Sequence, residues 1–257
     1  MCPWPRNASM HYPIAGFFYL LSSPSLWGTV FCVMLLGFSL ALTSILLLFV
    51  FTLRIQAEIL GDRQWWSYVL AVIAVLFESL FVTFFILKVV PMKCQIKIFT
   101  ETMKAKGRWT KDMKGPSVLR DFDTCKLGFL VRIITFPLNL IPVAGTILFA
   151  YINAPFTALD LMDMYFEALH MDYEAQMIEL TRCPKRSCGA MYTFNPYLRF
   201  GFMAILLETI PVFGPAIFSL SNACGAALWA CDMEANGGPP SYMANKSEKS
   251  TILDSEI

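Results

Sequence analysis

The stretch FPLNLIPVAGTILFAYINA, residues 136–154, combines an apolar run with two prolines, one glycine and two asparagines. Proline cannot continue the hydrogen-bond ladder of a helix, and glycine can adopt the positive φ of a tight turn. The motif Ile-Pro-Val-x-Gly within this run therefore predicts a break in the helix, with Pro142 and Gly145 at the turn.

A second copy of this stretch lies 69 residues further along the chain. Residues 207–233, LETIPVFGPAIFSLSNACGAALWACDM, align without a gap on residues 138–164, LNLIPVAGTILFAYINAPFTALDLMDM, and 12 of the 27 positions are identical. The second break falls at Pro211 and Gly214. The chain thus contains an internal repeat, a common feature of membrane transport folds.

The composition indicates that lipid is the solvent for much of this chain. Of 257 residues, 56% are hydrophobic, which is more than a single soluble core can bury. No charged residue occurs between Arg6 and Arg54. The formal net charge of +1 gives no information about acidic partners, and no nucleic-acid partner is expected.

Two long apolar segments predict transmembrane helices. The first, at 25–53, has 29 uncharged residues, whereas about 20 suffice to cross a hydrocarbon core of about 30 Å. The second, at 65–90, begins with an aromatic belt and has one central ionisable residue, Glu78. A short apolar segment before them, at 13–23, predicts a helix that lies at the membrane interface.

The arms around the repeated turns are shorter. In the second copy the arm from Leu198 to Ile210 has 13 residues, about 20 Å of helix, which is too short to cross. Each copy therefore predicts a hairpin that enters the membrane and returns to the same side. The predicted fold class is an all-α integral membrane protein with two long transmembrane helices plus two repeated pairs of short half-penetrating helices.

The predicted organisation is a single helical membrane domain, followed by a polar tail. The domain covers residues 1–234, and a disordered tail follows at 235–257. The domain comprises the interfacial helix and two spans at 12–92, a basic segment at 93–126, the first hairpin repeat at 127–169 and the second hairpin repeat at 196–234. The basic segment has nine Lys or Arg against four acids, which predicts a cytosolic location. Both termini are then cytosolic as well.

Polar residues on the arms are candidate functional groups. Asn153 and Asn222 occupy equivalent positions on the returning arms, where a polar side chain in lipid requires a hydrogen-bond partner. They can join helices to each other, or they can line a pathway or a ligand site. The sequence leaves both interpretations open.

Two carboxylates raise a similar choice. Glu208 replaces Asn139 just before the second turn, and it can titrate, pair with Arg132 or Arg199, or reach the membrane surface as an ordinary charge. Glu78 can couple to a proton or pair with a buried lysine or arginine.

Three acids on one predicted helix face suggest a further chemistry. Asp160, Asp163 and Glu167 are spaced i, i+3 and i+7, so they could hold Mg²⁺ and the diphosphate of an isoprenoid lipid. They also suit the wet face of a helix that leaves the membrane, and the second copy retains only Asp232. No phosphate-binding loop or catalytic motif occurs, so the sequence predicts no cofactor and a non-enzymatic protein.

The two turns, LNLIPVAG and ETIPVFG, resemble those of the etoposide-induced protein 2.4 and CysZ family. The segment FGFMAILLETIPVFGPAIFSLSNACGAALWACDME is especially similar to the fungal branch of that family, as is HYPIAGFFYLLSSPSLW near the start. The resemblance covers most of Tyr12 to Glu234. It implies two long spans and two pairs of half-penetrating helices.

The resemblance also implies functions. Fungal members are associated with lipid droplets and outer spore wall assembly, so we expect a multi-pass protein of the endoplasmic reticulum and lipid droplets that handles lipid or assembles the spore wall. CysZ members are sulfate permeases, and their motif would make Leu138, Asn139 and the turn from Pro142 to Gly145 an anion site. The alternatives are therefore an anion permease or channel and a Mg²⁺-dependent membrane enzyme. The expected partner is a lipid bilayer or monolayer, and association with a second copy of the chain is left open.

Overall fold

The structure, a computed structural model, describes residues 9–61, 65–89, 92–109, 113, 122–141, 143–171, 175–176, 179, 195–210 and 214–236. Within these ranges every regular element is a helix, beginning with a single 3₁₀ turn, η1, at Ser9–His11. The predicted all-α class is confirmed for this part of the chain.

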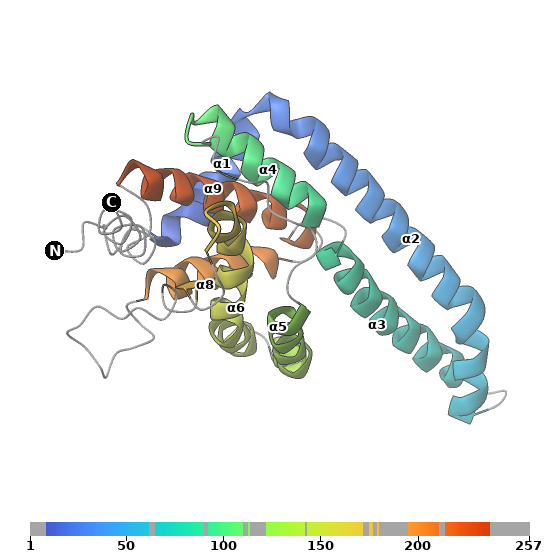
Figure 1. Cartoon of the computed structure of the whole chain (residues 1–257). Helices are drawn as coiled ribbons and strands as arrows, with labels where there is room; N and C mark the ends of the chain where they lie inside the picture. The colour runs from blue at the N-terminus through green and yellow to red at the C-terminus, as the bar shows by residue number, and fades with distance from the viewer. Residues whose placement is uncertain are drawn as a thin grey trace, which may run out of the picture.

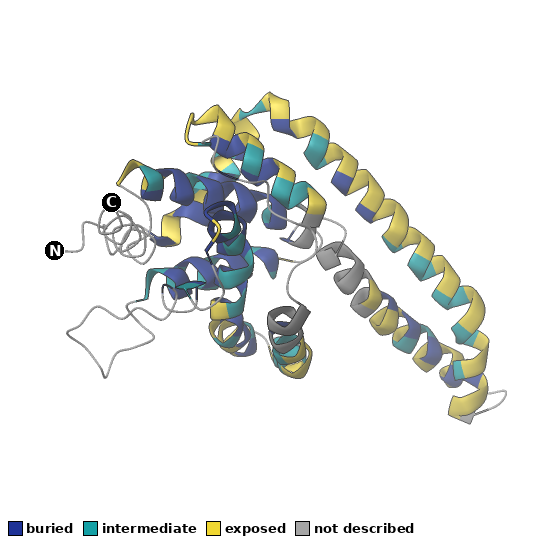
Figure 2. Cartoon of the chain, viewed as in Figure 1, coloured by how far each residue is buried: buried dark blue, intermediate teal, exposed yellow. Residues whose placement is uncertain are grey.

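Two long helices form a hairpin that extends away from the rest of the molecule (Figure 1). They are α2, Pro24–Gly61, and α3, Trp65–Val89, and they pack against each other. The 38 residues of α2 reach about 57 Å, well beyond the roughly 30 Å of a hydrocarbon core. Large apolar side chains such as Phe31, Phe51 and Phe77 are exposed along both helices (Figure 2). The outer surface of this hairpin therefore suits lipid rather than water.

By length and composition, two of the described helices could cross a membrane: α2, and α6, which comprises Ala144–Ala168. The predicted second span, at 65–90, forms α3, which is also 25 residues long and whose stretch Trp65–Ser79 is apolar. α6 has the same length and continues through Pro155. The arm that begins at the first turn is thus longer than a half-penetrating helix requires.

The remaining helices form a body around α9, Ser219–Ala235. α9 packs against α1, Tyr12–Ser22, and against α4, Met92–Ala105, while α6 packs against α8, Pro196–Glu208 (Figure 1). All residues from 219 to 227 are buried (Figure 2). The C-terminal arm of the second repeat is therefore the central helix of the body.

Small residues permit the close helix crossings in this body. A Cβ atom on Gly16 of α1 would collide with the backbone of Gly225 of α9, and one on Gly225 would collide with the backbone of Tyr12. A Cβ atom on Gly201 of α8 would collide with the carbonyl of Ala154 in α6. Both crossings use the close backbone approach that glycine permits between helices in lipid.

Two predicted segments form helices of the body. The helix predicted at 13–23 is α1, which buries one face against α9 while Ile14, Phe18 and Leu21 on its other face are exposed. The basic segment at 93–126 contains α4 and the start of α5, Phe122–Thr135. A short apolar helix looks alike in sequence whether lipid or protein covers it, so composition could not place α1.

The two repeated turns share their backbone hydrogen bonds. The first lies between η2, Phe136–Leu140, and α6, and the second between α8 and η3, Gly214–Phe218. The amide of Gly145 donates to the carbonyl of Ile141 at 3.2 Å, and that of Gly214 to Ile210 at 2.8 Å. The amide of Ile141 donates to the carbonyl of Leu138 at 3.0 Å, and the amide of Ile210 donates to that of Leu207 at 3.3 Å. The repeat in sequence is thus a repeat in structure at the turn.

The glycines of the motif have a different role from the predicted one. Neither Gly145 nor Gly214 has a positive φ, and in the first turn that conformation falls on Val143, with φ 62° and ψ −65°. A Cβ atom on Gly145 would instead collide with the carbonyl of Leu138, and one on Gly214 with that of Glu208. The glycines are needed because the returning helix begins directly against the end of the preceding arm.

Candidate functional site: polar groups beneath the two turns

Asn153 lies in the middle of α6 and is fully buried. Its Nδ2 donates to Oγ1 of Thr135, the last residue of α5, at 2.8 Å and to the carbonyl of Phe149 at 2.9 Å. A backbone carbonyl can only accept, so the Phe149 contact fixes which side-chain atom is the nitrogen. The asparagine therefore joins the two arms of the first repeat beneath their turn.

Asn222 does the same in the second repeat. It is also fully buried, and its Nδ2 donates to the carbonyl of Ala204 at 3.0 Å and to Oε1 of Glu208 at 3.1 Å. Position 204 is equivalent to position 135 of the first repeat, so the link between the arms recurs at the same place. Glu208 is itself buried, with 6% of its surface exposed. The geometry agrees with the interpretation that these asparagines join helices.

The side-chain oxygens beneath the turns are less well satisfied. Oδ1 is buried in Asn153, Asn222 and the partly buried Asn139, and in none of the three does it have a hydrogen-bond partner among the described residues. Together with the carboxylate of Glu208, these oxygens accept hydrogen bonds rather than donate them. Such groups suit a water molecule or another donor, whereas an anion would require free N–H or O–H groups.

Arg132 of α5 makes a charged contact in the first repeat. Its Nη2 donates to Oδ2 of Asp160 at 2.8 Å and to Oγ1 of Thr157 at 2.9 Å. Arg132 was predicted as one of two partners of Glu208. Glu208 accepts a hydrogen bond from Asn222, while the contacts of Arg132 with Thr157 and Asp160 join α5 to α6.

The predicted Mg²⁺ face does not form a recognisable metal site in the part of the chain that is described. Asp160 accepts from Arg132, and Asp163 and Glu167 are half-buried on the same helix. Among the described residues no group of three or more acids, histidines or cysteines is arranged to hold a metal ion. An arginine in contact with Asp160 supplies the positive charge that a metal would otherwise provide.

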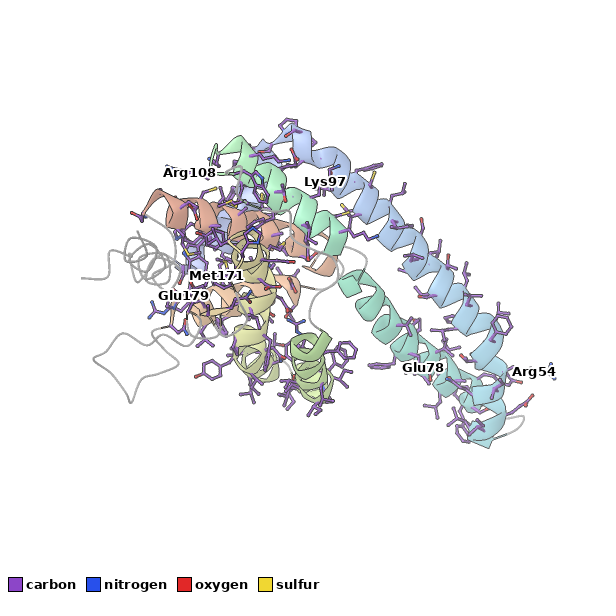
Figure 3. The ribbon with its side chains drawn as sticks, viewed as in Figure 1. Arg54, Glu78, Lys97, Arg108, Met171 and Glu179 are labelled. Carbon is purple, nitrogen blue, oxygen red and sulfur yellow. The ribbon has the colours of Figure 1, made fainter. Side chains whose placement is uncertain are left out.

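Glu78 lies near the far end of the α2–α3 hairpin, on the same side as Arg54 (Figure 3). Its Oε1 accepts a hydrogen bond from Nε2 of Gln56 at 2.8 Å. Arg54 bonds Glu58 at 3.1 Å on the exposed surface of the same helix end. The partner of Glu78 is therefore an amide near the polar end of α2, and not a buried lysine or arginine.

Two tyrosine–carboxylate contacts were not predicted. The hydroxyl of Tyr12 donates to Oδ2 of Asp232 and that of Tyr165 donates to Oε1 of Glu234, each at 2.6 Å. Burial, together with the Asp232 carboxylate, raises the pKa of Tyr12 above its ordinary value. These contacts fasten α1 and α6 to the C-terminal end of α9.

Aromatic rings from α1, α8 and α9 pack together next to the Tyr12–Asp232 contact. Trp229 of α9 lies 5.8 Å from the ring of Tyr12, 4.9 Å from Tyr197 and 5.2 Å from Phe200. One sequence pattern indicates this aromatic cluster, because the motif Tyr-x-x-x-Gly-Phe occurs both at 12–17 in α1 and at 197–202 in α8. Both tyrosines contact Trp229 and both glycines make a close crossing.

Two predicted site residues, Pro142 and Pro211, lie outside the described residues, as do the polar tail from residue 237 on and most of the basic segment after α4. Asn139, Asn153, Glu208 and Asn222 are brought beneath the turns, whereas Glu78 lies apart from them (Figure 3).

The chain was compared with known families and curated proteins. No family model matches it, and no curated protein is significantly similar to it.

Proposed function

We propose that this chain is a multi-pass, non-enzymatic membrane protein of the endoplasmic reticulum and lipid droplets, with a role in lipid handling or outer spore wall assembly. The observation that supports membrane insertion best is the character of the repeated turns. Turn residues at a water-facing surface are usually polar. Here the exposed turn residues are apolar: Ile141, Ile210 and Val143, of which Val143 is 73% exposed.

The surroundings of the first turn extend this apolar surface. Exposed large side chains continue from Val143 onto α5 and the first half of α6, including Ile134, Ile147 and Leu148 (Figure 2). The C-terminal half of α6, in contrast, is buried in the body. One end of the first repeat therefore suits lipid, and the other end suits a protein interior.

The backbone of the turns also fits lipid. An unpaired backbone group costs several kcal/mol in hydrocarbon. The amides of Ile141, Gly145, Ile210 and Gly214 all donate to carbonyls within the turns. These four amides therefore need no water if this part of each turn lies below the membrane surface.

We propose that the repeats enter the membrane as hairpins from one side while α2 and α3 provide the long anchor. The short arm α8 has 13 residues, which supports this arrangement in the second repeat. The length of α6 also allows a full crossing in the first repeat. The charges of the hairpin support a bilayer such as the endoplasmic reticulum over a droplet monolayer, in which a crossed α2–α3 hairpin would leave Arg54 and Glu58 in oil.

Cysteine labelling tests the arrangement directly. In a folded chain without native cysteines, Ile141→Cys and Ile210→Cys should react with a lipophilic maleimide and resist a water-soluble one on both sides of the membrane. Glu101→Cys, exposed on α4, is the control that should react from the cytosolic side. Labelling of Ile141→Cys from the lumen would show that the first repeat crosses fully and would refute the hairpin model.

The lipid role has its own test. It rests on the resemblance of the turns and of residues 200–234 to the fungal branch, together with the apolar surfaces above. The tagged full chain should fractionate with carbonate-resistant membranes and move toward droplets when neutral lipid accumulates. Exclusive droplet location with a lumenal 54–64 segment would contradict it.

The two alternatives find less support in the described geometry. The unsatisfied oxygens beneath the turns accept hydrogen bonds and so do not favour a sulfate-type anion. Asp160 on the acid face of α6 contacts Arg132, which does not favour a Mg²⁺-dependent enzyme. Sulfate flux in proteoliposomes that is lost in the Asn139→Ala variant would favour the anion permease over the lipid role.

A further inference from the structure

α4 carries a row of cations whose function is not explained by its packing. Residues 92–109 contain five Lys or Arg against one acid, Glu101. Four exposed residues of the helix are spaced i, i+4, i+8 and i+11: Lys93, Lys97, Glu101 and Lys104. This row lies along a single face of the helix.

The opposite face of α4 is fixed to the body. Ile98, Phe99 and Met103 are completely buried, and Oγ1 of Thr102 lies 3.3 Å from Sγ of Cys224 in α9. Nε2 of Gln95 donates to the carbonyl of Ser219 at 3.4 Å. The basic row is therefore held in a fixed orientation and does not need to bind the body.

The row also lies beside the start of the long anchor. Ile98 and Cys94 of α4 pack in one cluster with Leu26 and Val33 of α2. Figure 3 places Lys97 and Arg108 on the side of the body from which α2 begins. If α2 enters the membrane near Pro24, the cations lie at the level of the lipid headgroups.

Aromatic side chains complete an interfacial pattern. Trp27 is exposed at the start of α2, and its Nε1 donates to the carbonyl of Leu20 at 3.1 Å. Nζ of Lys106 lies 5.0 Å from the ring centroid of Tyr19 in α1. Aromatic rings and lysines at one depth are typical of a membrane–water interface.

We propose that the basic row of α4 (Lys93, Lys97 and Lys104), together with the exposed Lys106 and Arg108 just after the helix, binds the headgroups of anionic phospholipids in the leaflet where α2 begins. This inference rests on the proposed membrane insertion. The headgroup phosphates and carboxylates complement the excess of positive charge, and the adjacent anchor keeps the face at the bilayer surface. An acidic protein would have to compete with lipid that is always present at this depth.

The test uses the full chain reconstituted in phosphatidylcholine vesicles that contain spin-labelled phosphatidylserine or spin-labelled phosphatidylcholine. The wild type should immobilise the serine lipid in preference to the choline lipid, and about 1 M salt should remove most of that preference because the Debye length falls to about 3 Å. The triple variant Lys93→Gln, Lys97→Gln, Lys104→Gln should lose it, with a decrease of up to about fivefold per cation removed.

Two matched variants sharpen the test. Arg54→Gln removes an exposed cation at the far end of α2 and should leave the preference unchanged. Glu101→Gln removes the acid within the row and should strengthen the preference. A triple variant that keeps its helical circular dichroism and the wild-type preference would overturn the inference while leaving membrane insertion intact. A wild-type chain that is washed from the vesicles by carbonate would overturn both proposals.

Discussion

The two repeats share one turn but differ in what surrounds it. In the first, Arg132 bonds Asp160 and the arm after the turn exposes apolar side chains. At the positions equivalent to these two residues the second repeat has Gly201, at a close helix crossing, and Trp229, in the aromatic core. The comparison shows how one duplicated unit can provide both a surface and a core, because the turn is set by its own backbone and the arms are free to diverge.

The largest expected effect comes from exchanging an arm residue between the repeats. Gly225 of α9 is equivalent to Phe156 of α6, and Gly225→Phe would place a ring where the backbone of Tyr12 lies. We expect a loss of at least about 4 kcal/mol in the free energy of unfolding, which amounts to loss of the fold. Thermal unfolding in detergent, followed by circular dichroism, measures it. Leu228→Phe, at a half-buried neighbour, is the control, and equal behaviour of the two variants would show that α1 does not pack on α9.

The next effect concerns the paired asparagines. Asn222→Leu removes a donor from the buried carboxylate of Glu208, whereas Asn153→Leu removes one from a neutral hydroxyl and a carbonyl. We expect Asn222→Leu to lower the free energy of unfolding by about 2–4 kcal/mol and Asn153→Leu to lower it by about 1–2 kcal/mol, because hydrogen bonds to charged groups are stronger than those to neutral groups. Denaturant titration of both variants in one detergent gives the difference. A greater loss in the first repeat would mean that Asn153 has a partner beyond those described.

A smaller effect is expected at the ion pair that only the first repeat has. The side chains of Arg132 and Asp160 are 26% and 34% exposed, so solvent screens their attraction. A double-mutant cycle of Arg132→Gln and Asp160→Asn should give a coupling energy of no more than about 1 kcal/mol. Coupling well above that value would indicate that the pair is buried in its native membrane.

The smallest effect tests the strain of the first turn. Val143 has the dihedral angles of a classic γ-turn, which is a strained conformation for a β-branched residue. Val143→Gly should raise the free energy of unfolding by about 0.5–1 kcal/mol, because relief of strain exceeds the entropy that glycine loses. Ile141→Gly, whose φ is −88°, should instead lower it by a similar amount. If both variants are destabilised, another contact compensates the strain at Val143.

The sequence predicted the turns, the repeat and the first anchor, since each has a local cause. The Ile-Pro-Val-x-Gly motif disfavours a continuous helix through its own backbone, although α6 continues through Pro155, and 29 uncharged residues are enough to span a hydrocarbon core. The partners of the arms could not be predicted in the same way. Whether Glu208 meets Arg132 or Asn222 depends on the crossing of α8 and α9, which no local pattern encodes.

The role of the glycines was only half predicted. Their spacing after the proline indicated a tight turn, but positive φ falls on Val143 and the glycines prevent a collision. The same holds for Gly16 and Gly225, whose importance lies in a contact between segments about 200 residues apart. Patterns within one segment carry no information about such a contact.

The contact between α1 and α9 also has a consequence for synthesis. The glycine face of α1 leaves the ribosome more than 200 residues before its partner on α9. At about 5–20 residues per second, that face waits roughly 10–40 s without the helix that covers it. The body can therefore close only once α9 has been synthesised.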